Sequence, residues 1–208
     1  MRIILDFDYT LFDMKTFKRR LFDLFLEHGV SPKLVASSYE ESKKGGGNYS
    51  PIQQFQILET AGVSDISKLE QKFDALVREA GNYLYSDAVP FVEKMRARHS
   101  LALLSHGEEG FQRSKIRACA FVYDACVEIV VTGNAQKDTE AAKLADGQRA
   151  IFIDDKPAVL AAAKKLAPNI VTVRMNRGEG PYADEVGGEG IDYEVKNLKE
   201  VEILLGNL

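Results

Sequence analysis

The stretch RIILDFDYTLFD (Arg2–Asp13) places two carboxylates directly after an apolar run. Asp6 and Asp8 stand two positions apart, and Thr10 follows at the same spacing. Two carboxylates this close repel each other, and neither is stable in an apolar core without a partner. The stretch therefore predicts a buried strand whose carboxyl end either forms an acidic turn or presents its aspartates to a cation and a substrate.

The composition is that of an ordinary globular protein. The chain has 208 residues, of which 45% are hydrophobic and 28% charged, and this suits one large domain or a core with a smaller insertion. The net charge of −4 gives no reason to expect nucleic acid or an anionic membrane as a partner. No signal peptide or membrane-spanning run is recognisable, and Cys119 and Cys126 lack the spacing of a zinc-binding pair. We therefore expect a cytoplasmic protein with reduced cysteines.

Short apolar runs alternate with helical patterns over much of the chain. These runs are apolar almost throughout, which is typical of strands covered on both faces. In order they are RIILD (2–6), LALLS (101–105), VEIVVTG (127–133), AIFIDD (150–155), NIVTVRM (169–175) and, more weakly, IDYEV (191–195). Helical patterns precede the second, fourth and fifth runs, and another closes the chain. The alternation predicts an α/β fold with a doubly wound, Rossmann-like parallel sheet.

One segment, 14–85, shows helical patterns and no convincing strand. Its clearest patterns, each ending in a glycine suited to a helix C-terminus, are FKRRLFDLFLEHG (17–29), PIQQFQILETAG (51–62) and ISKLEQKFDALVREAG (66–81). Such a segment is too long for a loop in a compact fold. We therefore expect an inserted all-helical cap over 14–85 and a catalytic core formed by 1–13 and 86–208.

Two glycine-rich stretches are expected to be loops. KKGGGNYS (Lys43–Ser50) lies within the predicted cap and is either a plain surface linker or a mobile loop whose lysines close over an anionic substrate. NRGEGPYADEVGGEG (176–190) lies late in the chain and is expected to be exposed.

Polar side chains follow the predicted strands at the edge where open α/β sheets bind their ligands. In strand order they are Asp6, Asp8 and Thr10; Ser105, His106 and Gly107; Lys137, in the loop after the third strand; and Asp154 and Asp155. Several carboxylates crowd together only when a hard divalent cation neutralises them, and oxygen ligands suit magnesium. A lysine and a hydroxyl supply donors to phosphate. One aspartate can then attack phosphorus while its neighbour shuttles a proton.

These pieces resemble, in the same order, the motifs of the haloacid dehalogenase-like (HAD) hydrolase superfamily. LDFDYTLFD (5–13) is similar to the DxDxT motif, and LALLSHG (101–107) is similar to the strand that ends in Ser or Thr. Lys137 is similar to the isolated basic residue, and IFIDDKP (151–157) to the acidic pair. The expected helical insertion also resembles the cap that many members carry after the first motif, so the resemblance spans nearly the whole chain.

The resemblance implies a role for each residue. Asp6 would be the nucleophile that forms an aspartyl-phosphate, and Asp8 the acid and base that serves the leaving group and then water. Thr10 would support the geometry of their loop and take part in substrate binding. Ser105 and Lys137 would hold the oxygens of the transferring phosphoryl group, with Lys137 also restraining Asp6.

The resemblance also implies a magnesium ion. It would be bound by the Asp6 carboxylate, the backbone carbonyl of Asp8 and the acidic pair, with Asp155 as a direct ligand and Asp154 bound directly or through water. The motifs depart from the common pattern at two positions. Tyr9 stands where many relatives have glycine, and His106 follows Ser105 where asparagine is common. His106 and Gly107 are therefore expected to meet the substrate.

The leading hypothesis is a magnesium-dependent phosphatase acting on a small phosphorylated metabolite. A phosphomutase with the same site is the nearest alternative. A dehalogenase is less favoured, because Asp8 and a magnesium site serve phosphoryl transfer. A non-catalytic binding protein on the same fold would be free to lose a nucleophile or a metal ligand, whereas this chain retains each of them. The sequence leaves the substrate and the oligomeric state open.

Overall fold

The computed structural model describes residues 1–43, 47–133 and 136–207. The described residues form one six-stranded sheet in the order β3-β2-β1-β4-β5-β6, in which every neighbouring pair is parallel. The strands are β1 (Arg2–Leu5), β2 (Ser100–His106), β3 (Glu128–Thr132), β4 (Ala150–Asp154), β5 (Ile170–Met175) and β6 (Tyr193–Val195). Each coincides with one of the apolar runs, so the predicted parallel α/β sheet is confirmed.

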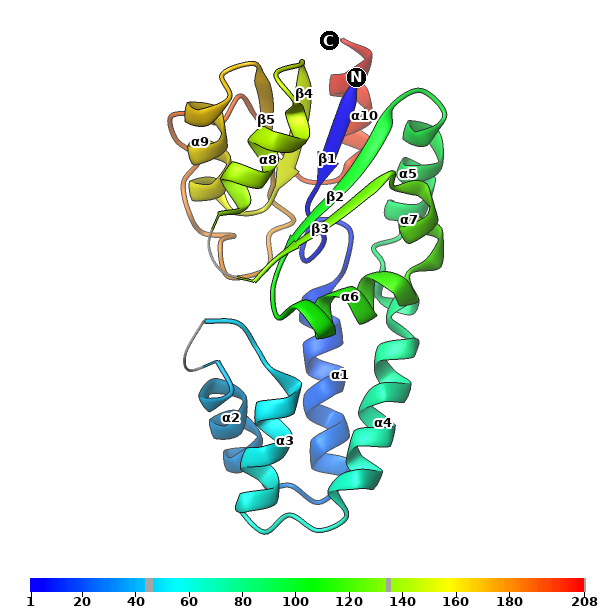
Figure 1. Cartoon of the computed structure of the whole chain (residues 1–208), viewed down its shortest axis with the longest axis vertical. Coiled ribbons are helices and arrows are strands. Elements are labelled where there is room, and N and C mark those ends of the chain that lie inside the picture. The colour runs from blue at the N-terminus through cyan, green and yellow to red at the C-terminus, as the bar shows by residue number, and fades with distance from the viewer. Residues whose placement is uncertain (44–46, 134–135, 208) are drawn as a thin grey trace.

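Helices cover both faces of this sheet, as Figure 1 shows. One face packs against α8 (Lys137–Ala145) and α9 (Pro157–Leu166). The other packs against α5 (Ala88–Arg96), α6 (Glu109–Ala118), α7 (Ala120–Ala125) and α10 (Leu198–Gly206). Alternate residues of β1 serve the two faces, since Ile4 joins one apolar cluster while Ile3 and Leu5 join the other. This explains why the central strands β1, β2 and β4 are apolar almost throughout.

The segment between β1 and α5 is helical. It contains α1 (Met14–Glu27), α2 (Pro32–Glu41), α3 (Pro51–Thr60), α4 (Ile66–Arg78) and a 3₁₀ turn, η1 (Ala80–Tyr83), and none of its described residues belongs to a strand of the sheet. We refer to α1–α4 as the cap helices; in Figure 1 they form the lower body of the molecule. The division into a core of 1–13 and 86–208 and a cap of 14–85 stays a prediction. Of the expected loop Lys43–Ser50, residues 44–46 lie outside the described residues.

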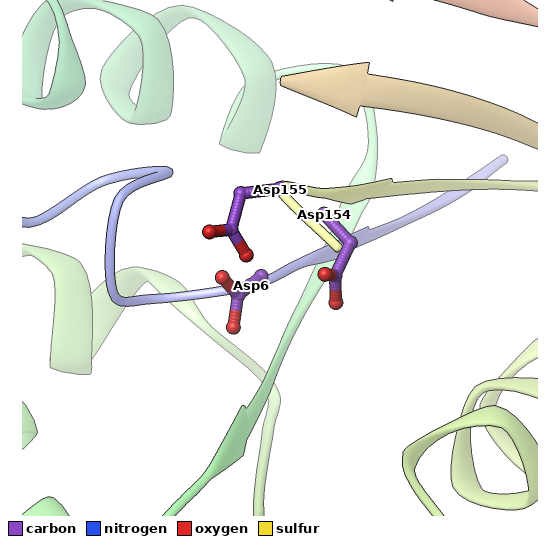
Figure 2. A group of neighbouring side chains, drawn as sticks. All are labelled: Asp6, Asp154 and Asp155. Carbon is purple, nitrogen blue, oxygen red and sulfur yellow. The ribbon is translucent and has the colours of Figure 1, made fainter. Parts of the chain in front are cut away.

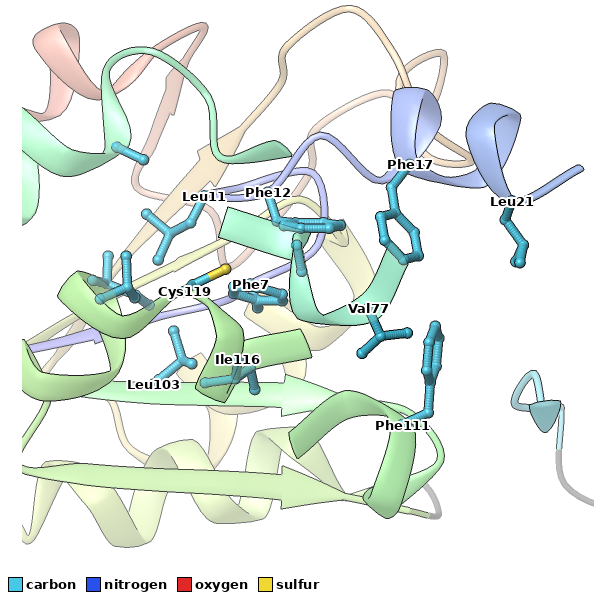
Figure 3. Close-up of a cluster of buried hydrophobic side chains, with 14 of the residues drawn as sticks. Phe7, Leu11, Phe12, Phe17, Leu21, Val77, Leu103, Phe111, Ile116 and Cys119 are labelled. Carbon is cyan, nitrogen blue, oxygen red and sulfur yellow. The ribbon is translucent and has the colours of Figure 1, made fainter. Parts of the chain in front are cut away.

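The cap helices and the sheet share one apolar cluster, part of which is drawn in Figure 3. Phe17 of α1 and Val77 of α4 belong to the same buried cluster as Phe7 and Leu103. Phe111 of α6 joins them, with its ring centroid 6.3 Å from that of Phe17. The junction between cap helices and sheet is therefore a packed core.

The structure bears on the state of the cysteines and on the search for membrane-spanning helices. Cys119 and Cys126 are both free thiols, the first buried and the second half-buried. Within the described ranges, no helix combines the length and apolar character that crossing a membrane requires.

The loop that leads into β6 touches α9 at Gly190, and the contact generates a stability prediction. Gly190 has a φ of +87°, and a Cβ added there would lie 2.9 Å from the Cα of Ala161. We expect Gly190→Ala to lower the free energy of unfolding by about 2 kcal/mol, because a left-handed backbone and a helix backbone atom both oppose the methyl group.

Denaturant unfolding measures this change. Gly188→Ala is the matched control, since a Cβ there would meet nothing within 4 Å. We expect the control to stay within about 0.5 kcal/mol of the wild type. Equal losses in the two variants would contradict the argument.

Candidate active site

The sheet order brings three carboxylates to one edge. Asp6 follows β1, and its backbone N–H donates to the carbonyl of Ile153 on β4 at 2.9 Å. Asp154 ends β4 and Asp155 comes next. Because β1 and β4 are parallel neighbours, their carboxyl ends meet, and Figure 2 shows the three side chains grouped there. One oxygen from each carboxylate lies within 4.8 Å of the others.

A tight turn after β1 directs the aspartates away from the core. The carbonyl of Phe7 accepts hydrogen bonds from the backbone N–H groups of Leu11 and Phe12, each at 2.9 Å. The rings of Phe7 and Phe12 stack with centroids 4.9 Å apart, and both are fully buried. The apolar residues of the motif therefore anchor the turn, which leaves Asp6 and Asp8 on the wall of a cavity.

The Lys137 ammonium links two of the carboxylates. Lys137 is the first residue of α8, and its buried Nζ contacts Asp6 Oδ1 and lies 2.7 Å from Asp154 Oδ2. The Thr10 hydroxyl donates to the other oxygen of Asp6 at 3.3 Å. Burial lowers the pKa of Lys137, but the charges of Asp154 and Asp6 outweigh it and raise the pKa above its ordinary value. The ammonium form is therefore the one present in the site.

The carboxylates still exceed the positive charge nearby. Burial raises the pKa of Asp6 to about 7, although the Lys137 ammonium opposes this. Burial and the charges of Asp6 and Asp154 raise the pKa of Asp155 to about 9. Among the described residues no hydrogen bond or ion pair holds Asp155, whereas Asp154 receives Lys137 on one oxygen and the Lys156 N–H, at 2.8 Å, on the other. This donor set fits a hard divalent cation, with Asp155 the carboxylate most open to it.

Asp8 is held by two residues that the sequence reasoning missed. Lys115 Nζ lies 2.8 Å from Asp8 Oδ1, and the Gln112 amide donates to Asp8 Oδ2 at 2.9 Å. The same amide donates to the Ser105 hydroxyl at 2.6 Å. Lys115 is only 1% exposed, and its ammonium lies within 6.0 Å of the ring centroids of Phe7, Phe12, Phe17 and Phe111. Asp8 is therefore the anion that balances a cation buried among aromatic rings.

A signal for this pair exists in the sequence. In α6 the buried residues are Phe111, Gln112, Lys115 and Ile116, which form one helical stripe. Two polar residues on an otherwise apolar stripe indicate partners inside the fold, because buried polar groups are normally hydrogen-bonded.

The predicted site residues divide into two groups around a cavity of about 380 Å³. Those that line it are Asp6, Asp8, His106, Lys137, Asp154 and Asp155. Thr10, Ser105 and Gly107 are not among its described lining residues. The hydroxyls of Thr10 and Ser105 contact Asp6 and Gln112, and the Gly107 N–H donates to the Thr132 carbonyl at 3.1 Å. Substrate binding by these three stays a prediction.

The two unusual residues of the motifs both line the cavity. Tyr9 has a left-handed φ of +59°, a conformation that glycine adopts more easily, and burial raises the pKa of its hydroxyl to about 12. Burial, together with the charges of Lys137 and Lys156, lowers the pKa of His106. Neutral imidazole and phenol groups therefore face the space where a substrate would lie.

The late glycine-rich loop belongs to the site, although the sequence suggested only an exposed connection. Pro181 and Tyr182 line the cavity. Arg177 donates to the carbonyl of Thr10 at 2.8 and 3.1 Å, which ties the loop to the turn after β1. A Cβ added at Gly180 would lie 2.9 Å from the ring of Tyr9, so the loop backbone packs directly on that side chain.

The Asp8–Lys115 pair generates a stability prediction. Asp8→Asn leaves the buried Lys115 ammonium without an anion, so we expect the free energy of unfolding to fall by about 3 kcal/mol. The double variant Asp8→Asn/Lys115→Met removes the unpaired charge and should recover much of the loss. Denaturant unfolding checks both. A double variant no more stable than the single one would show that charge burial is not the cause.

The raised carboxyl pKa values generate a pH prediction. A carboxyl group with a raised folded-state pKa contributes stability that is present below its unfolded pKa and lost as pH rises through its folded pKa, here about 7 for Asp6 and about 9 for Asp155. A divalent cation replaces the bound protons and reverses the loss. We expect magnesium to raise the melting temperature more at about pH 8.5 than at about pH 6.

Thermal unfolding with magnesium and with chelator measures this difference. Asp155→Asn should abolish most of the magnesium effect, since it removes the most open carboxylate. Equal magnesium effects at both pH values would contradict the assignment of the cation to these carboxylates.

Comparisons with known proteins place this geometry in a fold class. No protein-family model matches the sequence, and no curated protein matches it. Among solved structures, a protein described as a haloacid dehalogenase-like hydrolase from Burkholderia xenovorans LB400 aligns with a TM-score of 0.77 and 18% identity over 99% of this chain and 96% of its own.

Two further structures are similar over nearly their whole length. The HAD-hydrolase YfnB from Bacillus subtilis, bound to magnesium, has a TM-score of 0.62 and 17% identity over 98% of this chain and 97% of its own. L-2-haloacid dehalogenase from Xanthobacter autotrophicus, with chloropropionic acid covalently bound, has a TM-score of 0.64 and 13% identity over 100% and 98%. The fold of this chain, from β1 to α10, is therefore that of the haloacid dehalogenase-like hydrolases.

Proposed function

We propose that this protein is a magnesium-dependent phosphatase that hydrolyses a small phosphorylated metabolite through an aspartyl-phosphate on Asp6. The observation that carries the proposal is the meeting of Asp6, Lys137 and Asp155 at one cavity, from three separate parts of the chain. The magnesium bound to YfnB, a protein of similar fold, supports the choice of cation. A cavity of about 380 Å³ suits a small substrate.

The residues support a two-step displacement. Asp6 attacks phosphorus, and the bond to the leaving oxygen breaks as that oxygen receives a proton that Asp8 carries into this step. Asp8 then takes a proton from water, whose oxygen attacks the same phosphorus and releases Asp6 and inorganic phosphate. Lys115 and Gln112 hold Asp8 at the cavity wall throughout.

The remaining charges suit a phosphoryl group. Lys137 is the ammonium at the cavity that lies beside the nucleophile, so it stabilises the negative charge of the transferring oxygens. Asp6, Asp155 and the backbone carbonyl of Asp8 would hold the magnesium ion. Asp154 would hold it directly or through water and also orients Lys137. When bound, the ion supplies positive charge that neutralises both carboxylates and phosphoryl oxygens.

Dehalogenation is disfavoured by the same charges. L-2-haloacid dehalogenase has a similar fold, so the fold alone does not separate the two reactions. Cleavage of a carbon–halogen bond needs a nucleophilic carboxylate but no cation site. Asp155, which lies beside Asp6 and has no ion-pair partner in the described part of the chain, and Asp8 at the cavity wall favour phosphoryl transfer.

Hydrolysis of p-nitrophenyl phosphate tests the proposal. We expect activity with magnesium, loss of activity with chelator, and a fall of about three orders of magnitude or more in Asp6→Asn. Release of inorganic phosphate distinguishes a phosphatase from a phosphomutase. Asp23→Asn, an exposed aspartate on α1, is the matched control and should keep the wild-type rate. Wild-type turnover by Asp6→Asn would remove the nucleophile assignment.

A further inference from the structure

Two lysines of the cap region share one tyrosine ring. The ammonium groups of Lys18, on α1, and Lys43, two residues beyond the end of α2, each lie 4.2 Å from the centroid of the Tyr39 ring. Tyr39 is buried, and Tyr49 stacks on it with centroids 4.8 Å apart. The packing of the ring therefore fixes where two positive charges gather.

Among the described residues, these two positive charges are offset only in part. Lys43 donates to Glu40 at 2.9 Å, and the Glu40 side chain is 66% exposed. No carboxylate pairs with Lys18 in the described part of the chain. Burial and the neighbouring Lys43 charge lower the pKa of Lys18, which is the effect of two ammonium groups held close together. The cluster thus carries a net positive charge in a half-buried position.

Packed rings connect the lysine cluster to the catalytic turn. The Tyr49 ring, which stacks on Tyr39, has its centroid 5.4 Å from that of Phe111. Phe111 in turn flanks the Lys115 ammonium that pairs with Asp8. The side chain of Asn48 donates to the carbonyl of Gly133, just past β3. This contact ties the end of the loop after α2 to the edge of the sheet where the site lies.

An anionic group on the substrate would pair with the positive charge of the lysine cluster. Five of the thirteen described residues that line the cavity are aspartates, and the two lysines among them are Lys137, beside Asp6, and Lys156. The lysine cluster offers a further positive site for a second anionic group of the same molecule, on the side of the cap helices. The Tyr39 hydroxyl, which has no hydrogen-bond partner among the described residues, adds a neutral donor there.

We propose that Lys18 and Lys43 form a second anion subsite, which binds a carboxylate or a second phosphate at the end of the substrate remote from the transferred phosphoryl group. The proposal rests on the proposed phosphatase function and adds a substrate class, phosphate monoesters that carry a second anionic group. Glu40 competes with that group for Lys43, and so limits the affinity of the subsite.

Matched pairs of monoesters test the subsite by binding. Calorimetry on the Asp6→Asn protein compares 3-phosphoglycerate with glycerol 3-phosphate for a carboxylate, and fructose 1,6-bisphosphate with fructose 6-phosphate for a phosphate. We expect the charged member of at least one pair to bind about tenfold more tightly than its neutral partner. Adding Lys18→Gln or Lys43→Gln should reduce that advantage to near parity. Lys33→Gln, an exposed lysine at the start of α2, is the control and should preserve it.

In one variant we expect the affinity advantage of the charged member to grow. Glu40→Gln releases Lys43 and should increase the advantage of the charged member, which a general loss of folding would not do. Equal binding of both members of each pair, or an advantage that survives in both lysine variants, would overturn the subsite. Hydrolysis of p-nitrophenyl phosphate by the wild-type protein reports separately on the phosphatase function, because the binding comparison needs no turnover.

Discussion

The contact of one ammonium group with two buried carboxylates is the constraint on which the site depends. Asp6 and Asp154 are 4% and 0% exposed, at the ends of neighbouring strands, and the Lys137 ammonium offsets the burial of both carboxylates. Lys137 reaches them because α8 begins at that residue, beside the strands it packs on. The order of the strands and the position at which α8 begins together bring Lys137 to Asp6 and Asp154. Asp155 is then the carboxylate that is left to bind a cation.

Asp8 also forms an ion pair with a buried lysine, but this lysine lies among aromatic rings. Lys115 balances Asp8 from within a group of aromatic rings, and those rings come from both the cap helices and the core. Phe17 belongs to α1 and Phe111 to α6, while Phe111 also lies 5.7 Å, ring to ring, from Phe73 of α4. The packing that joins cap helices to sheet is thus also the environment of the residue assigned to proton transfer. Substitutions among these packed rings are therefore expected to alter the surroundings of Asp8 even when the substituted residue does not line the cavity.

Hydropathy predicts the strands and their acidic ends well, because a strand buried on both faces has an unmistakable apolar run and parallel strands must end at one edge. Hydropathy does not predict the site residues of α6, Gln112 and Lys115, which are polar residues on the buried stripe of that helix. The stripe indicates that these polar groups have partners inside the fold, but it does not identify them, because Asp8 and Ser105 lie on other elements. The loop with Arg177 and Gly180 was missed for the same reason, since its contacts are to Thr10 and Tyr9 at the other end of the chain.

The position of β1 has a consequence for how the chain reaches its native state. β1 is made before β2 and β4, the strands between which it lies, and these begin at Ser100 and Ala150. During translation β1 therefore has no neighbouring strand until β2 has been made, and the turn after it meets Arg177 later still. Such long-range pairing slows folding and leaves an apolar strand open to aggregation. In the nascent chain, β1 is therefore expected to need shielding until β2 and β4 have left the ribosome.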